Sequence, residues 1–185
     1  MKLTVYPRSK DGKGHVRRLR YANEIPGVVY GSKKKSEAIF MKGADFHAIL
    51  RAVPPNQLST TMIDLQLHSE TYKVIVKDVQ YHRTTYDIQH IDFAIVVKDT
   101  PVVVLVPIRC DGAAECAGVK LGGMLRQVIR SIKVECLPKD IPAVFAFDVK
   151  NMGIADSKRL SELSIPAGVK PIAKMDEVFV TVAKR

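Results

Sequence analysis

Basic side chains that could bind phosphate groups are concentrated at the beginning of the chain. Ten of its 29 Lys and Arg residues fall in the first 35 positions, which hold only two acids, Asp11 and Glu24. Lys and Arg neutralise backbone phosphates and release counterions, and glycines let the main chain approach a ligand closely. We therefore expect a phosphate-binding surface here; the alternative is a solvated basic loop and helix. The candidate residues are Arg8, Lys13, Arg17, Arg18 and Arg20.

An aromatic residue and a glycine end this segment, in the run Ile25-Pro-Gly-Val-Val-Tyr-Gly31. Tyr30 could stack on a base or donate its hydroxyl proton, and Gly31 lets a ligand come close to the main chain. These residue types, added to the basic ones, favour a nucleic acid over a small anion.

His90 and Asp92 could suggest a metal site or a catalytic pair, but the surrounding sequence supports neither. A metal site needs three or four converging ligands, and the other histidines show no i, i+4 spacing. The chain also lacks nucleophile, Walker and dinucleotide-binding motifs, so we expect no enzyme activity, no cofactor and no small-molecule substrate. In a strand the two side chains share one face, where they could reach base edges or 2′-hydroxyls of a folded RNA. An Asp within a basic surface can accept a hydrogen bond from a base amino group.

The elements that must position these residues alternate between strands and short helices. The pattern predicts a helix over residues 14–23, with Val16 and Leu19 inward, and a second helix that Asp45 would cap, with Phe46 in the core. Strands are predicted over residues 3–7, 25–30, 36–42, 60–67, 72–81 and 88–97.

The pattern changes around residues 98–101, and we place a domain boundary near residue 97, giving domains 1–96 and 97–185. The second half shows short strands between turn signals, over residues 102–109, 125–137 and 178–182. The predicted fold is mainly β with short helices, the second domain being all-β.

Composition limits the possible partners. The formal net charge of +10 exceeds what solubility requires, so we expect an anionic partner, with nucleic acid ahead of a membrane surface. The longest apolar run, residues 102–106, is far shorter than the roughly 20 residues of a membrane span. The N-terminus resembles a strand more than a signal peptide, so the expected location is cytoplasmic.

Three cysteines, Cys110, Cys116 and Cys136, occur without a CxxC spacing. An odd number at these spacings indicates neither a disulfide framework nor a zinc site. We interpret them as small buried or half-buried apolar residues.

Four blocks of the first half resemble, in order and spacing, the bacterial large-subunit ribosomal protein family L-twenty-five, whose long form is called Ctc or general stress protein. They are Lys13-Gly14 with Arg17-Arg-Leu-Arg20, then Ile25 to Gly31, Lys77-Asp-Val-Gln80 and Gln89-His-Ile-Asp-Phe93. The second half resembles the C-terminal β domain of the long form. The runs concerned are Gly118 to Leu125, Leu137 to Pro142, Phe147 to Val149 and Ile165 to Val169.

The resemblance implies a large-subunit protein that binds the loop E region of 5S ribosomal RNA through an N-terminal six-stranded β barrel with helices. Residues matching the family's RNA contacts are Arg8, Lys13, Arg17, Arg18, Arg20, Tyr30, Gly31, Gln80, His90 and Asp92. Lys77 stands where some relatives have glutamine, and we expect a phosphate contact there. Many long relatives end in an acidic tail, whereas this sequence ends in Ala183-Lys-Arg185.

The resemblance also implies a location and partners, and two alternative functions remain open. The expected location is ribosome-associated, with the C-terminal domain against neighbouring ribosomal proteins or 23S ribosomal RNA, and no membrane. The alternative function is a stress-induced factor that docks on the ribosome through its C-terminal β domain. A third class, an appendage of an enzyme such as glutaminyl-tRNA synthetase, would require a catalytic domain that 185 residues do not contain.

Overall fold

Alternating apolar side chains in the first half of the chain all point into one interior. A computed structural model describes residues 1–8, 13–31, 34–68 and 70–184. The chain folds as two units, Met1–Thr100 and Pro101–Arg185.

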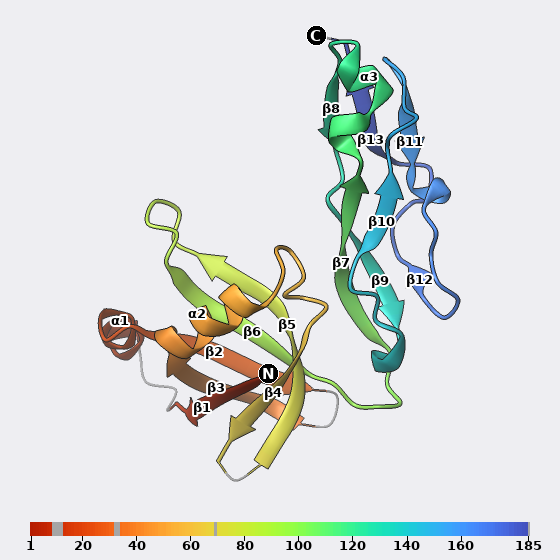
Figure 1. The fold of residues 1–185 in the computed structure, drawn as a ribbon. Coiled ribbons are helices and arrows are strands. Elements are labelled where there is room, and N and C mark those ends of the chain that lie inside the picture. Colours follow the sequence, from red (N-terminus) through yellow and green to blue (C-terminus); the bar gives the residue numbers. More distant parts are fainter. Residues whose placement is uncertain (9–12, 32–33, 69, 185) are drawn as a thin grey trace. The chain divides into compact units, whose positions relative to one another are not determined.

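The first unit is a closed β barrel with two helices (Figure 1). Its elements are β1 (Lys2–Pro7), α1 (Lys13–Tyr21), β2 (Glu24–Gly31), β3 (Lys34–Lys42), α2 (Gly43–Ala52), β4 (Met62–Leu67), β5 (Glu70–Tyr81) and β6 (Ile88–Ile95). The strands follow the order β1-β3-β2-β6-β5-β4 around the barrel. The predicted six-stranded barrel with helices is confirmed, and most element ends lie within about two residues of those expected.

The barrel interior holds the core. Leu3, Ile39, Ile63, Val74 and Ile91 come from five different strands, belong to one apolar cluster and are essentially inaccessible to solvent. Strands β1 and β4 alternate buried and accessible residues, because successive side chains point to opposite faces, whereas β5 is buried on both faces over residues 74–76. The barrel wall therefore has a polar outer surface available for a ligand.

Helix α2 adds its apolar side to this core. Phe46 of α2 meets Phe93 of β6 edge to face, with ring centroids 6.5 Å apart. The predicted cap is wrong: the helix begins at Gly43, with Lys42 as the N-cap residue and no side-chain cap, so Asp45 lies in the first turn. There its carboxylate is near the positive end of the helix dipole.

One glycine fixes how closely β2 and β6 pair. These strands are parallel, with Gly27 opposite Ile91. A Cβ atom at Gly27 would lie 2.7 Å from the Ile91 carbonyl oxygen, which is too close for any side chain. This close approach brings the outer surfaces of β2 and β6 together.

The second unit is built from strands, one short helix and 3-10 turns. Its strands and helix are β7 (Val102–Asp111), α3 (Ala117–Lys120), β8 (Met124–Gln127), β9 (Ser131–Cys136), β10 (Phe145–Asp148), β11 (Ser157–Arg159), β12 (Lys170–Pro171) and β13 (Val178–Ala183). They form a sheet of order β10-β7-β9-β12 and a second of order β11-β13-β8.

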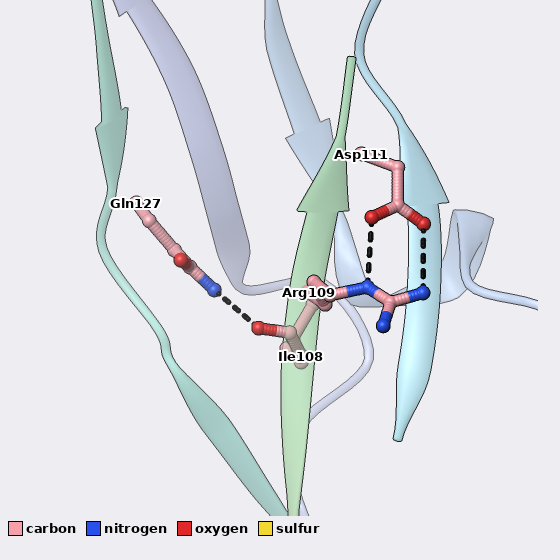
Figure 2. Close-up of polar contacts among 4 residues, drawn as sticks. All are labelled: Ile108, Arg109, Asp111 and Gln127. Carbon is pink, nitrogen blue, oxygen red and sulfur yellow. Dashed lines mark hydrogen bonds and ion pairs between the residues drawn. The ribbon is translucent and has the colours of Figure 1, made fainter. Parts of the chain in front are cut away.

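The single strand predicted over residues 125–137 is wrong. The chain forms β8 in one sheet, leaves it at residues 128–130, and forms β9 in the other. Gln127 bridges this crossing, because its side-chain amide donates to the carbonyl oxygens of Ile108 and Ile129, at 3.0 and 3.2 Å. Figure 2 shows Gln127 reaching Ile108, beside the paired side chains of Arg109 and Asp111.

The cysteines are free, with Cys116 and Cys136 buried and Cys110 half-buried, which confirms their interpretation as apolar residues. Burial raises the pKa of the Cys110 and Cys136 thiols. Among the residues that the structure describes, no helix has the length and apolarity to span a bilayer.

Candidate nucleic-acid interface

Helix α1 presents three arginines to solvent. Leu19 is buried and anchors the helix, while Arg17, Arg18 and Arg20 are exposed. The exposure of the arginines follows from helix geometry. When Leu19 faces the barrel, the positions next to it in the sequence face outward.

A side-chain contact ties α1 to strand β6. The guanidinium of Arg20 donates from Nε and Nη2 to the carbonyl oxygen of Gln89, at 3.3 and 3.1 Å. Gln89 is next to His90 in the sequence, so this contact brings the arginine-bearing helix beside the strand that carries His90 and Asp92.

His90 and Asp92 form a close pair on the outer face of β6. Their neighbours Ile91 and Phe93 are fully buried, which confirms the alternation expected from the sequence. His90 Nδ1 lies 2.7 Å from Asp92 Oδ1. That oxygen is shielded from solvent and receives no well-aligned hydrogen bond from the described residues. The Asp92 side chain is nevertheless 31% exposed, so a donor from outside approaches this carboxylate through Oδ2.

The register of the sheet brings further polar residues to this pair. Gln80 of β5 is opposite His90, and Asp78 is opposite Asp92. Asp78 was missed by the sequence reasoning, although its two-residue spacing from Gln80 places it on the same strand face. Two carboxylates directly opposite each other repel, so this part of the surface favours a ligand that supplies hydrogen-bond donors.

Tyr30 belongs to the same group. It lies near the end of β2, with Val28 of the same strand beside Asp92. Burial, and to a lesser extent the charges of Asp92 and Asp78, raises the pKa of the Tyr30 hydroxyl above its ordinary value. The hydroxyl therefore keeps its proton and can donate it to a ligand. Gly31 follows Tyr30 as the last residue of β2.

Lys77 occupies an irregular position in β5. The pairing with β6 shifts register between Val76 and Asp78, so Lys77 is the extra residue of a bulge. A bulge changes the direction in which a side chain points, and Lys77 is exposed.

Arg8 is not brought into this group by any hydrogen bond or ion pair between described residues, and the Lys13 side chain is not described. The main-chain N–H of Arg8 donates to Ala38 on β3, at 2.8 Å, and no contact between described residues joins Arg8 to β6. Its Nε is enclosed without a hydrogen-bond acceptor among those residues. Lys13 is the first residue of α1, and its side chain lies outside the described part of the structure.

The assembled surface holds guanidinium donors on α1, and a hydroxyl, an amide, an imidazole and two carboxylates on β2, β5 and β6. Within the described ranges, His, Cys, Asp and Glu residues form no group of three that could hold a metal ion. The geometry fits an extended ligand with phosphate groups on one side and hydrogen-bonding edges on the other.

Comparison with known proteins identifies the two halves of the chain. Residues 3–93 match the Ribosomal L25p family, and residues 101–185 match the C-terminal domain of ribosomal protein TL5. Proteins called "Large ribosomal subunit protein bL25" from Chlamydia abortus, Chlamydia muridarum and Chlamydia pneumoniae are each 40% identical to it over 185 residues, the full length of both chains. The chain belongs to the ribosomal L25p family.

Membership confirms the resemblance to the long form of this family. It also confirms the expected location, in the cytoplasm and associated with the ribosome. The chain is a structural ribosomal protein.

Proposed function

We propose that this chain is a non-enzymatic component of the large ribosomal subunit that binds the loop E region of 5S ribosomal RNA. The contact of Arg20 with Gln89 carries the proposal, because it joins the phosphate-binding helix to the strand with base-reading groups. Phosphate contacts give affinity and position, whereas base-edge contacts give specificity, and a folded RNA supplies both. Relatives that match over their full length are named as proteins of the large subunit.

The proposed RNA-contacting residues fall into two groups, those that bind phosphates and those that contact bases or 2′-hydroxyls. Arg17, Arg18 and Arg20 bind phosphates, because guanidinium groups on an exposed helix form charge-assisted, often bidentate hydrogen bonds. Tyr30 and Gln80 donate to bases or 2′-hydroxyls, and His90 and Asp92 complete the reading of base edges.

Further predicted contacts flank this surface. Arg8, Lys13 and Lys77 bind phosphates at its margins, and Gly31 allows the RNA to approach the end of β2. RNA binding by the predicted domain 1–96 leaves the second domain, 97–185, to contact neighbouring ribosomal proteins or 23S ribosomal RNA.

The proposal is tested by titrating 5S ribosomal RNA with the full chain and the variants Arg18→Ala and Arg51→Ala. Both arginines are exposed, on α1 and α2 respectively, and each substitution removes one positive charge. We expect Arg18→Ala to weaken binding by about 1 to 3 kcal/mol and to reduce the salt slope by about one, because a phosphate contact is lost. Arg51→Ala should stay within a few tenths of a kcal/mol of the parent chain.

Equal affinities of the two variants for 5S ribosomal RNA would contradict the proposed surface. A binding constant that does not change with salt would contradict phosphate binding itself. The alternative, a stress-induced factor docking through the C-terminal domain, is not favoured by any of the comparisons.

A further inference from the structure

A cavity of about 490 Å³ opens at the end of α1, beside the proposed RNA surface. Its lining comes from α1, from the beginnings of β2, α2 and β6, and from the turn between β5 and β6. This volume is within the range of small-ligand sites, which is about 300 to 1,000 Å³.

The floor of the cavity is a fixed main-chain contact. Asn23 has a positive φ of 60°, and its carbonyl oxygen accepts a hydrogen bond of 2.9 Å from the Gly43 N–H. A Cβ atom at Gly43 would lie 2.7 Å from that oxygen, so only glycine allows the beginning of α2 to lie this close to the turn that follows α1. The cavity is thus built by a close contact between elements.

One wall carries an aromatic ring and two cations. The guanidinium of Arg17 lies 5.5 Å from the ring centroid of Tyr21 and donates to its hydroxyl, at 3.1 Å from Nη2. The Tyr21 side chain remains 76% exposed. Arg20 lies beside it, fixed by the Gln89 carbonyl.

Further donors and acceptors come from the turn between β5 and β6 and from residues of β2 and α2. His82 Nδ1 lies 3.4 and 3.2 Å from the main-chain nitrogens of Thr84 and Thr85, which donate to it, so its Nε2 is left as a donor. His47 also lines the cavity, as do the carboxylates of Glu24 and Asp87. Neither carboxylate takes part in an ion pair between described residues, so both keep their capacity to accept hydrogen bonds.

We propose that this cavity binds one nucleotide whose base carries an exocyclic amino group. Arg17 and Arg20 bind the phosphate, and the exposed ring of Tyr21 stacks on the base. Glu24 and Asp87 accept hydrogen bonds from the amino group of adenine, cytosine or guanine, which uracil lacks. A bare anion fits less well, because the same two carboxylates repel it.

The nucleotide has two possible sources, a base unstacked from the bound RNA or a free nucleotide. The first rests on the proposed function. Two binding experiments on the full chain separate these sources, and the variant Tyr21→Ala is compared in both with Tyr86→Ala. Tyr86 is equally exposed, at 76%, but does not line the cavity.

In the first experiment, AMP, CMP, GMP and UMP are added while the main-chain amide signals of Gly43, Thr85 and Gln89 are followed by NMR. We expect saturable shifts with the first three nucleotides and binding several-fold weaker for UMP. Tyr21→Ala should weaken nucleotide binding roughly tenfold and Tyr86→Ala should not. In the second, both variants and Arg18→Ala are titrated with 5S ribosomal RNA, and thermal melting checks their folding.

Weakened RNA binding by Tyr21→Ala identifies a nucleotide of the RNA as the ligand. Nucleotide shifts with unchanged RNA affinity identify a free nucleotide. If nucleotides shift none of the three amides and Tyr21→Ala binds RNA like the parent chain, the cavity proposal is overturned. In that case, weaker binding of 5S ribosomal RNA by Arg18→Ala still supports the proposed function. Unchanged affinity of all variants for 5S ribosomal RNA contradicts both the proposed function and the cavity proposal.

Discussion

The carboxylate of Asp92 is the most informative single group on the proposed surface, because a purely phosphate-binding surface would have no use for it. In Asp92→Asn the negative charge is removed while the shape is kept. If the carboxylate accepts from a base amino group, this variant should bind 5S ribosomal RNA about 1 to 3 kcal/mol more weakly, with an unchanged salt slope. Tighter binding of Asp92→Asn in the same titration would show that the carboxylate only repels phosphates.

Tyr30 gives a prediction about pH. Because the pKa of its hydroxyl is raised in the folded state, the unfolded chain ionises first as the pH increases. The stability linked to Tyr30 is therefore fully present below pH 10, the ordinary tyrosine value, and is lost as the pH rises through the folded pKa. Urea unfolding at several values between pH 8 and 11 should show a steeper loss for the parent chain than for Tyr30→Phe. Parallel curves would contradict this assignment.

Among the elements, β2 and β6 must pair closely for the surface to exist. Gly27→Ala would force Cβ against the Ile91 carbonyl, so the strands would separate or the barrel would strain. We expect a loss of about 1 to 3 kcal/mol in the free energy of unfolding, and weaker RNA binding in parallel. Gly14→Ala, in helix α1 where a Cβ meets nothing within 4 Å, is the control and should be at least as stable as the parent chain, because alanine favours a helix over glycine. Equal melting temperatures of the two variants would be inconsistent with this view.

The second unit depends on Gln127 to hold its crossing from β8 to β9. In Gln127→Leu two carbonyl oxygens, those of Ile108 and Ile129, would lose their donor in a half-buried place. The expected cost is about 1 to 3 kcal/mol in the unfolding of this unit, measured by thermal or urea denaturation. A variant as stable as the parent chain would show that water replaces the amide without cost.

The alternation of apolar and polar residues predicted the barrel strands well, because most of these strands bury only the face that points into the barrel. The period of two in residues 88–95 predicts that His90 and Asp92 share a face, and the structure confirms it. The same pattern misled over residues 125–137, where a change of sheet was hidden inside an apparently continuous strand. The alternation does break there, since Val128 and Ile129 are adjacent apolar residues at the point where the chain changes sheet.

Contacts between elements could not be predicted in the same way. The contact of Arg20 with Gln89 spans 69 positions of the sequence, and no local pattern encodes it. The contact of Asn23 with Gly43 is of another kind, because it extends the pairing of β2 with β3, in which Glu24 lies opposite Lys42. The cavity beside α1 was therefore invisible to sequence reasoning.

At the scale of the whole molecule, positive charge is local to one part of the chain. The first 35 residues carry a net charge of +8, out of +10 for all 185. The unit Met1–Thr100 carries a net charge of +6, because residues 36–100 contribute −2, and the unit Pro101–Arg185 carries the remaining +4. Concentrated electrostatic attraction therefore lies in the first 35 residues, and the boundary after residue 96 stays a prediction about where RNA binding ends. We expect the second unit to help position the protein on the large ribosomal subunit and to contribute little to the affinity for 5S ribosomal RNA.

Chemical footprinting of 5S ribosomal RNA, with and without the full chain, tests the central claim most directly. The reagents should report both sugar and base accessibility along the whole RNA, because the proposed surface contacts phosphates and base edges together. We predict protection confined to the loop E region, and loss of that protection in Arg18→Ala but not in Arg51→Ala. Protection spread over other helices of the RNA, or none at all, would contradict the account.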